Sequence, residues 1–170
     1  MSSLNKNTFL KSFMFYFPTL VLFLSVLNEI DLNYLDIEYF SFNFVYILIF
    51  YWTLKNPHYL SYGSIFIAGL VNDVVTGLPI GISSLCYLLI CAVTAYLRNI
   101  TLTPNFMNDW LSLLFTILLV NSIQVMSLDL IFSIDVNYMR YFINSGFTFV
   151  FYPLFLYLFS ILENKIKTQK

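Results

Sequence analysis

The sequence has little charge, and this scarcity decides its class. Only 10% of its 170 residues are charged, whereas 59% are hydrophobic and 20% are aromatic. A soluble domain carries about 25% charged residues, so this chain lacks the polar surface that a water-soluble globule needs. Each bilayer crossing takes roughly 20 apolar residues, which leaves room for about six crossings. The composition therefore predicts an all-α polytopic membrane protein with a single integral domain over residues 1–170.

Residues that carry catalysis or bind metals are also scarce. The single histidine, His58, stands beside Pro57 in a predicted turn, without a neighbouring cysteine or acid. Cys86 and Cys91 are five residues apart, on different faces of a helix, and we interpret both as packing residues rather than as a disulfide or a metal site. The glycine patterns of nucleotide-binding loops are missing, as are the basic clusters that bind nucleic acid. We expect no enzyme activity, no catalytic residues, no cofactor, no metal and no nucleic-acid partner.

Apolar runs between polar breaks predict six transmembrane helices, at about residues 9–27, 39–54, 59–75, 79–97, 110–128 and 141–162. Seven of the eight Lys and Arg residues fall near the termini or in alternate connections, at Lys6, Lys11, Lys55, Arg98, Lys165, Lys167 and Lys170. Cations concentrate on the cytoplasmic side of membrane proteins. We therefore expect both termini to be cytoplasmic, with the connections near Asp73 and between Asp129 and Arg140 at the outer face.

One stretch between the third and fourth runs is distinctive, and it reads GLVNDVVTGLPIG from Gly69 to Gly81. Gly77 suits the left-handed conformation that ends a helix, and Pro79 suits the first turn of the next, so the stretch predicts a tight helical hairpin. A carboxylate is costly to desolvate in apolar surroundings. Asp73 should therefore bind a partner or cap the amides at the start of the fourth helix. If it is a cap, we expect Asp73→Asn to retain most of the capping.

The third run also carries several small residues, which favour close approach of another helix in a bilayer. Ser64 and Ala68 have the small-xxx-small spacing, and Gly63 and Gly69 lie beside them. We therefore expect this helix to lie in the interior of the bundle.

Two amides in the fifth run predict an inward face. Asn121 and Gln124 lie three residues apart, on one side of a helix, and amides in hydrocarbon need hydrogen-bond partners. The acids Asp129 and Asp135 could converge with Asp73 on an ion or a cationic ligand, but we interpret these two as solvated acids of an outer connection.

The hairpin, read as G-L-x-x-D-x-x-[ST]-G-x-P-x-G before a serine-containing apolar helix, resembles the bacterial rod shape-determining protein MreD family. The matching residues are Gly69, Leu70, Asp73, Thr76, Gly77, Pro79 and Gly81. The resemblance implies a non-catalytic, multi-pass subunit of the cell-elongation complex in the bacterial inner membrane. Its implied partners are an MreC-like periplasmic protein, a RodA-type glycosyltransferase with its penicillin-binding transpeptidase, and an MreB-like filament. The implied fold is similar to the substrate-binding subunits of energy-coupling-factor vitamin transporters.

Two functions follow from this interpretation. The first is a scaffold that couples peptidoglycan synthesis to the cytoskeleton through helix-face contacts in the lipid bilayer. Its expected partner-binding residues are Gly63, Ala68, Gly69, Asp73, Thr76, Gly77, Pro79 and Gly81. The alternative is the substrate-binding subunit of a small-molecule (vitamin) uptake transporter, with Asp73, Asn121 and Gln124 lining a pocket. The few polar groups inside the predicted helices favour the scaffold.

Overall fold

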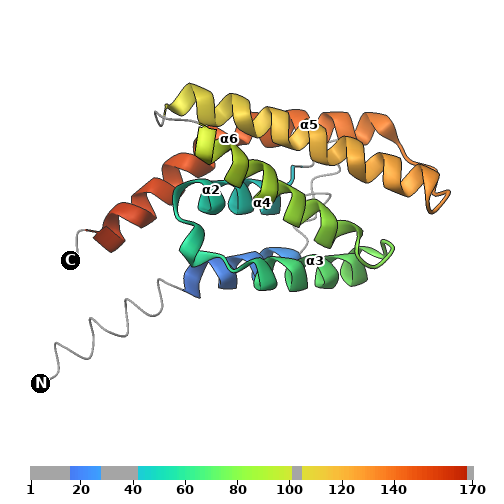
Figure 1. The fold of residues 1–170 in the computed structure, drawn as a ribbon, viewed down its shortest axis with the longest axis horizontal. Helices are drawn as coiled ribbons and strands as arrows, with labels where there is room; N and C mark the ends of the chain where they lie inside the picture. The colour runs from blue at the N-terminus through green and yellow to red at the C-terminus, as the bar shows by residue number, and fades with distance from the viewer. Residues whose placement is uncertain (1–15, 28–41, 101–104, 168–170) are drawn as a thin grey trace, which may run out of the picture.

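The computed structural model describes residues 16–27, 42–100 and 105–167 (Figure 1). Within these ranges every regular element is helical, which confirms the predicted all-α class. The elements are an N-terminal helix at Tyr16–Leu27, α2 at Phe44–Lys55, a short 3-10 helix η2 at Pro57–Tyr59, α3 at Tyr62–Thr76, α4 at Ile82–Ile100, α5 at Phe106–Leu130 and α6 at Tyr138–Lys167.

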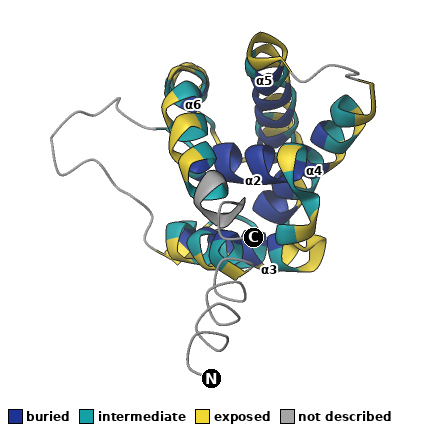
Figure 2. Cartoon of the chain, turned by 90° about the vertical axis from the view of Figure 1, so that its left-hand side faces the viewer, coloured by how far each residue is buried: buried dark blue, intermediate teal, exposed yellow. Residues whose placement is uncertain are grey.

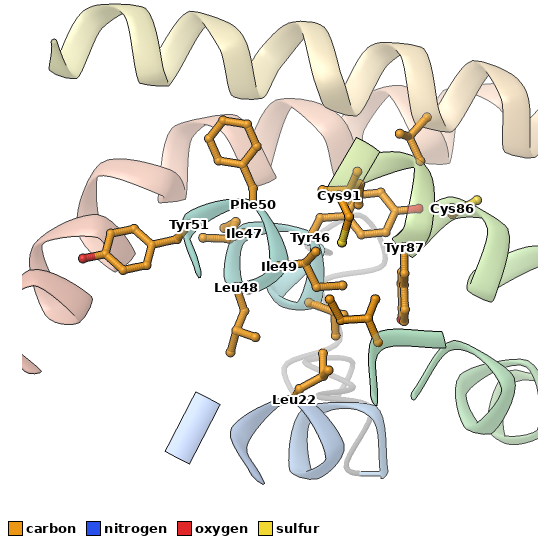
Figure 3. Close-up of a cluster of buried hydrophobic side chains, with 14 of the residues drawn as sticks. Leu22, Tyr46, Ile47, Leu48, Ile49, Phe50, Tyr51, Cys86, Tyr87 and Cys91 are labelled. Atoms are coloured by element: carbon orange, nitrogen blue, oxygen red, sulfur yellow. The ribbon is translucent and has the colours of Figure 1, made fainter. Parts of the chain in front are cut away.

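Helix α2 lies at the centre of the molecule, and its nine residues from Val45 to Thr53 are all buried. Its apolar side chains are spread around the whole helix rather than along one stripe, as in a helix that is covered on every side. Figure 2 shows α2 enclosed by α3, α4, α5 and α6. In Figure 3, Leu22 of the N-terminal helix points toward α2 from the opposite side to Phe50. The Phe50 ring meets Tyr152 of α6 edge to face, with 5.8 Å between ring centroids.

Three of the helices, α4, α5 and α6, are long and apolar enough to cross a membrane. The three other apolar helices of the described residues are shorter. The 12 residues of α2 rise about 18 Å, whereas the hydrocarbon core is about 30 Å thick. The structure thus supports a membrane protein, and the count of six crossings stays a prediction.

The start of α2 differs from the predicted run, which began at residue 39. The helix begins at Phe44 because Asn43 caps it: the Asn43 side chain accepts a hydrogen bond from the Tyr46 N–H. The Asn43 N–H in turn donates to Thr148 Oγ1 of α6 at 2.9 Å. This cap ties the beginning of α2 to the middle of α6. The predicted residues 9–15 and 39–41 lie outside the described ranges.

The ends of the helices fall into two groups along the long axis of Figure 1. Toward the left, at what we call the Lys55 end, lie the start of the N-terminal helix, the end of α2, η2, the end of α4, the start of α5 and the end of α6. The connection between α3 and α4 and the connection between α5 and α6 lie toward the right, which we call the hairpin end. Lys55 and Arg98 therefore share one end of the bundle, opposite Asp73. Which end faces the cytoplasm stays a prediction.

Candidate functional site

The hairpin between α3 and α4 is organised by Asp73, which is 0% exposed. Its Oδ2 accepts the Gly81 N–H at 2.7 Å, and its Oδ1 accepts the Ser83 N–H at 2.8 Å. These donors lie at the start of α4, where backbone N–H groups have no helical partner and where negative charge is favoured. The backbone oxygen of Asp73 also accepts the N–H groups of Gly77 and Leu78. One residue thus ends α3 and caps α4.

This geometry changes the expectation for Asp73→Asn. Each carboxylate oxygen accepts one N–H, whereas an asparagine offers one oxygen and one NH2 group. The amide nitrogen would face a backbone N–H, so the substitution keeps only half of the cap. Of the two roles that the sequence left open for Asp73, the cap is present in the structure, and no carboxylate oxygen reaches the surface.

The hairpin glycines differ in what requires a glycine: two have a left-handed backbone conformation, and one lies in a close contact between helices. Gly77 has φ +70° and Gly81 has φ +105°, conformations that favour glycine, and a Cβ on either would meet nothing within 4 Å. Gly69 is the close contact: its Cβ would lie 2.4 Å from the Cα of Ser84 in α4. The Ser84 hydroxyl also donates to the Phe66 backbone oxygen at 3.1 Å. Gly77 and Gly81 therefore shape the turn, and Gly69 lets the two helices touch.

The remaining hairpin residues of the predicted site occupy varied positions. Ala68 is 0% exposed, Gly63 is exposed, and Pro79 is half-buried. The Thr76 hydroxyl donates to the Asn72 backbone oxygen of its own helix. Pro79 lies before the helix rather than in its first turn, since α4 begins at Ile82.

Two contacts of this hairpin were missed in the sequence. Asn72 Nδ2 donates to Ser83 Oγ at 2.9 Å, beside the Asp73 cap. The Ser84 contact with Phe66 lies one turn further along the same interface. The pair of serines after Gly81 was the available signal, because small hydroxyl residues suit close helix contacts.

An apolar arc covers the outside of α3 and the turn. We call it the hairpin arc and define it by its exposed residues Tyr62, Gly63, Phe66, Ile67, Val74, Val75, Gly77 and Ile80. Val74 is 71% and Ile80 is 74% exposed. The buried side of the same helix carries Ala68, Gly69 and Asp73. Of the eight predicted partner-binding residues, three are buried (Ala68, Gly69 and Asp73), three are half-buried (Thr76, Pro79 and Gly81) and two are exposed (Gly63 and Gly77).

The predicted inward amides lie inside the bundle and hold other helices. Gln124 Oε1 accepts the Tyr46 hydroxyl of α2 at 3.1 Å. Asn121 Nδ2 donates to Ser145 Oγ of α6 at 2.8 Å. Among the hydrogen bonds of the described ranges, neither amide contacts Asp73, and a pocket lined by these three side chains stays a prediction.

A second polar group, which sequence reasoning missed, lies at the Lys55 end. Lys55 Nζ and Asp109 Oδ2 are 2.7 Å apart, and the Asp109 side chain is only 8% exposed. Nearby, the Tyr51 hydroxyl donates to Glu163 Oε2 at 3.0 Å. These pairs join residues 54 and 112 positions apart, so no local spacing in the sequence indicates them.

The acids of the connection between α5 and α6 do not converge on Asp73. Asp129 and Asp135 are both exposed, and Asp129 accepts the Tyr138 hydroxyl at 3.4 Å. Within the described part of the chain, no three His, Cys, Asp or Glu residues are grouped as metal ligands. Cys86 and Cys91 are buried free thiols.

Comparison with protein families gives one clear result: the family model of the rod shape-determining protein MreD matches residues 7–162. The match includes the N-terminal helix, the whole hairpin and most of α6. Comparisons with curated proteins and with solved structures find no match. Because the matched segment covers well over half of the 170 residues, this chain belongs to the family of the rod shape-determining membrane protein MreD.

Proposed function

We propose that this chain is a non-catalytic subunit of the rod-shape (cell-elongation) complex and that it binds the membrane helix of an MreC-like partner through the hairpin arc. Membership of the family supports the role in rod shape. One observation supports this binding site: the hairpin arc is apolar and exposed, and the buried carboxylate of the same hairpin is hydrogen-bonded through both oxygens. A RodA-type glycosyltransferase with its transpeptidase and an MreB-like filament complete the proposed partners.

The contacts inside the hairpin favour binding because they order the hairpin arc before a partner arrives. Asp73 fixes the angle between α3 and α4 through two backbone donors, and the Gly69 contact with Ser84 fixes their separation. A surface that is already ordered loses less conformational entropy when a partner docks. Gly63, in the arc, also allows a second helix to approach closely, which is how helices associate in lipid.

The same geometry gives less support to small-molecule uptake. The two inward amides are hydrogen-bonded to Tyr46 and Ser145, and Tyr46, which is 2% exposed, fills the space beside Gln124. A substrate would have to displace these contacts. The proposed orientation, with both termini cytoplasmic in the inner membrane, places the hairpin arc on the side of an MreC-like periplasmic protein.

Photocrosslinking from single positions in living cells tests this proposal. A crosslinking residue at Ile67 or Val74, in the arc, should capture the MreC-like partner. The matched control positions are Val150 and Leu154, equally exposed apolar residues of α6, where we expect lipid adducts. Partner capture from α6 alone, or only lipid adducts from the arc, would refute the site.

A further inference from the structure

A half-open crevice of about 230 Å³ lies at the Lys55 end, between the end of α2, the first turn of α5 and the last part of α6. Its polar lining includes Lys55, Asp109, Tyr51 and Glu163, and its apolar lining includes Phe106 and Leu156. A single water needs only about 10–15 Å³ of such space. The crevice therefore has room for a small polar group with an apolar continuation.

The crevice carries charges of both signs. Lys55 Nζ meets Asp109 Oδ2 at 2.7 Å, and a lysine ammonium has three donors, so Lys55 has donors for an anion as well. Glu163 adds a second carboxylate and accepts the Tyr51 hydroxyl at 3.0 Å. A ligand that matches this lining carries an anionic group beside Lys55 and a hydrogen-bonding cation beside Glu163.

A buried polar group without a hydrogen-bond partner lies close to the crevice. Tyr152 is 0% exposed, and its hydroxyl has no hydrogen-bond partner among the described residues. Tyr152 lies one helical turn before Leu156, which lines the crevice, and is not itself one of the lining residues. Burying a hydroxyl without a partner is costly. A polar atom that reaches past Leu156 toward this hydroxyl would supply the missing bond.

The residues around the crevice are of the kinds found at the level of bilayer headgroups. Lys55 ends α2, Asp109 is in the first turn of α5, and Glu163 is near the end of α6. Charged side chains collect at the membrane interface because they are expensive in the hydrocarbon, and tryptophans such as Trp110 are enriched there. Phe106, which is 43% exposed, adds an apolar wall. These features favour a lipid over a water-soluble ligand.

We propose that the crevice binds the headgroup of an amine-bearing phospholipid, with the phosphate beside Lys55 and the primary ammonium beside Glu163. A primary ammonium has three N–H donors for carboxylates, whereas a trimethylammonium has none. A lysine or arginine side chain from a partner protein would satisfy the carboxylates but would bring no anion to Lys55. This inference goes beyond the proposed binding of an MreC-like partner and depends only on insertion in a membrane.

Lipid retention by the full-length protein tests the proposal. The protein is placed in nanodiscs with equal amounts of phosphatidylethanolamine and phosphatidylcholine of the same acyl chains, then extracted, and its bound lipids are counted by native mass spectrometry. We expect at least about threefold enrichment of phosphatidylethanolamine. Glu163→Gln, which keeps the side-chain shape, should abolish most of this enrichment, because a charge-assisted bond becomes a neutral one. Asp135→Asn, an exposed acid at the hairpin end, is the matched control and should retain the preference.

A second variant separates lipid binding from folding. Tyr152→Phe removes only the unpaired hydroxyl, so the lipid-free melting temperature should stay the same or rise. The rise in melting temperature on adding short-chain phosphatidylethanolamine should become smaller. Equal retention of the two lipids by the unmodified protein would overturn the proposal. So would enrichment that survives Glu163→Gln, or an unchanged lipid response in Tyr152→Phe. A different result would identify the crevice as a protein contact: the unmodified protein shows no lipid preference, and Glu163→Gln loses a protein that co-purifies with the unmodified chain from cells.

Discussion

Two carboxylates are buried at opposite ends of this bundle, and they are neutralised in different ways. Asp73 is 0% exposed and accepts backbone N–H groups 8 and 10 residues further along the chain. Asp109 is 6% exposed and pairs with Lys55, 54 residues earlier. The first arrangement depends only on the local course of the backbone, and the second depends on the identity of a distant side chain. Asp73 therefore belongs to the folding of one hairpin, and Asp109 to the assembly of separate helices.

The largest effect is expected at the Asp73 cap. Asp73→Ala would leave two N–H groups at the start of α4 without their acceptor, at about 1–3 kcal/mol each, so the free energy of unfolding should fall by about 4 kcal/mol. Asp73→Asn should cost roughly half as much, since one acceptor remains. Thermal or denaturant unfolding in detergent measures both. Equal stability of Asp73→Asn and the unmodified protein would contradict the two-acceptor cap.

The next effect concerns the separation of the helices that carry this cap. In Gly69→Ala the new Cβ would press on the backbone of Ser84 at 2.4 Å, so α3 and α4 must move apart, at about 1–3 kcal/mol. Gly63→Ala is the matched control in the same helix, because its Cβ would meet only the Ser61 hydroxyl at 3.7 Å. The same unfolding measurement should show a lower melting temperature for the first and little change for the second. Equal melting temperatures for Gly69→Ala and Gly63→Ala would contradict a close contact at Gly69.

The ion pair at the other end should respond less. Lys55→Met leaves the Asp109 carboxylate without its cation, but the Lys55 side chain is 31% exposed, so water compensates in part. We expect a loss of about 1–2 kcal/mol, below the 3–5 kcal/mol of a fully buried pair. Adding Asp109→Asn should recover some of this loss. A double-mutant cycle measures the coupling, and strictly additive losses would show that the two charges do not interact.

The smallest effect is expected for a neutral bond in the middle of the bundle. Tyr46→Phe removes the hydrogen bond to Gln124, and such bonds between membrane helices average about 0.6 kcal/mol. Unfolding of Tyr46→Phe should therefore differ only slightly from the unmodified protein. If Tyr46→Phe lowered the free energy of unfolding as much as Lys55→Met, the neutral hydrogen bond would stabilise the packing of α2 as strongly as the ion pair does.

The same contrast explains what the sequence could predict. The hairpin and the left-handed Gly77 follow from neighbouring residues, and the inward side of Asn121 and Gln124 follows from their spacing along one helix. The role of Gly69 did not follow, because it depends on Ser84 of another helix. The Lys55 and Asp109 pair was also missed, since two residues 54 positions apart leave no periodic pattern. The start of α2 moved for a similar reason: its cap is completed by Thr148 of α6.

The enclosure of α2 has a consequence for genetics. From Val45 to Thr53 every residue of this helix is buried, and of these nine only Tyr51 lines the crevice at the Lys55 end, so a substitution at one of the other eight should alter cell shape by lowering the amount of folded protein. A screen for rounded cells should therefore recover two classes of variant. If the hairpin arc binds the proposed MreC-like partner, variants in α2 should be depleted from the membrane, whereas variants in the hairpin arc should be present at normal abundance and still fail.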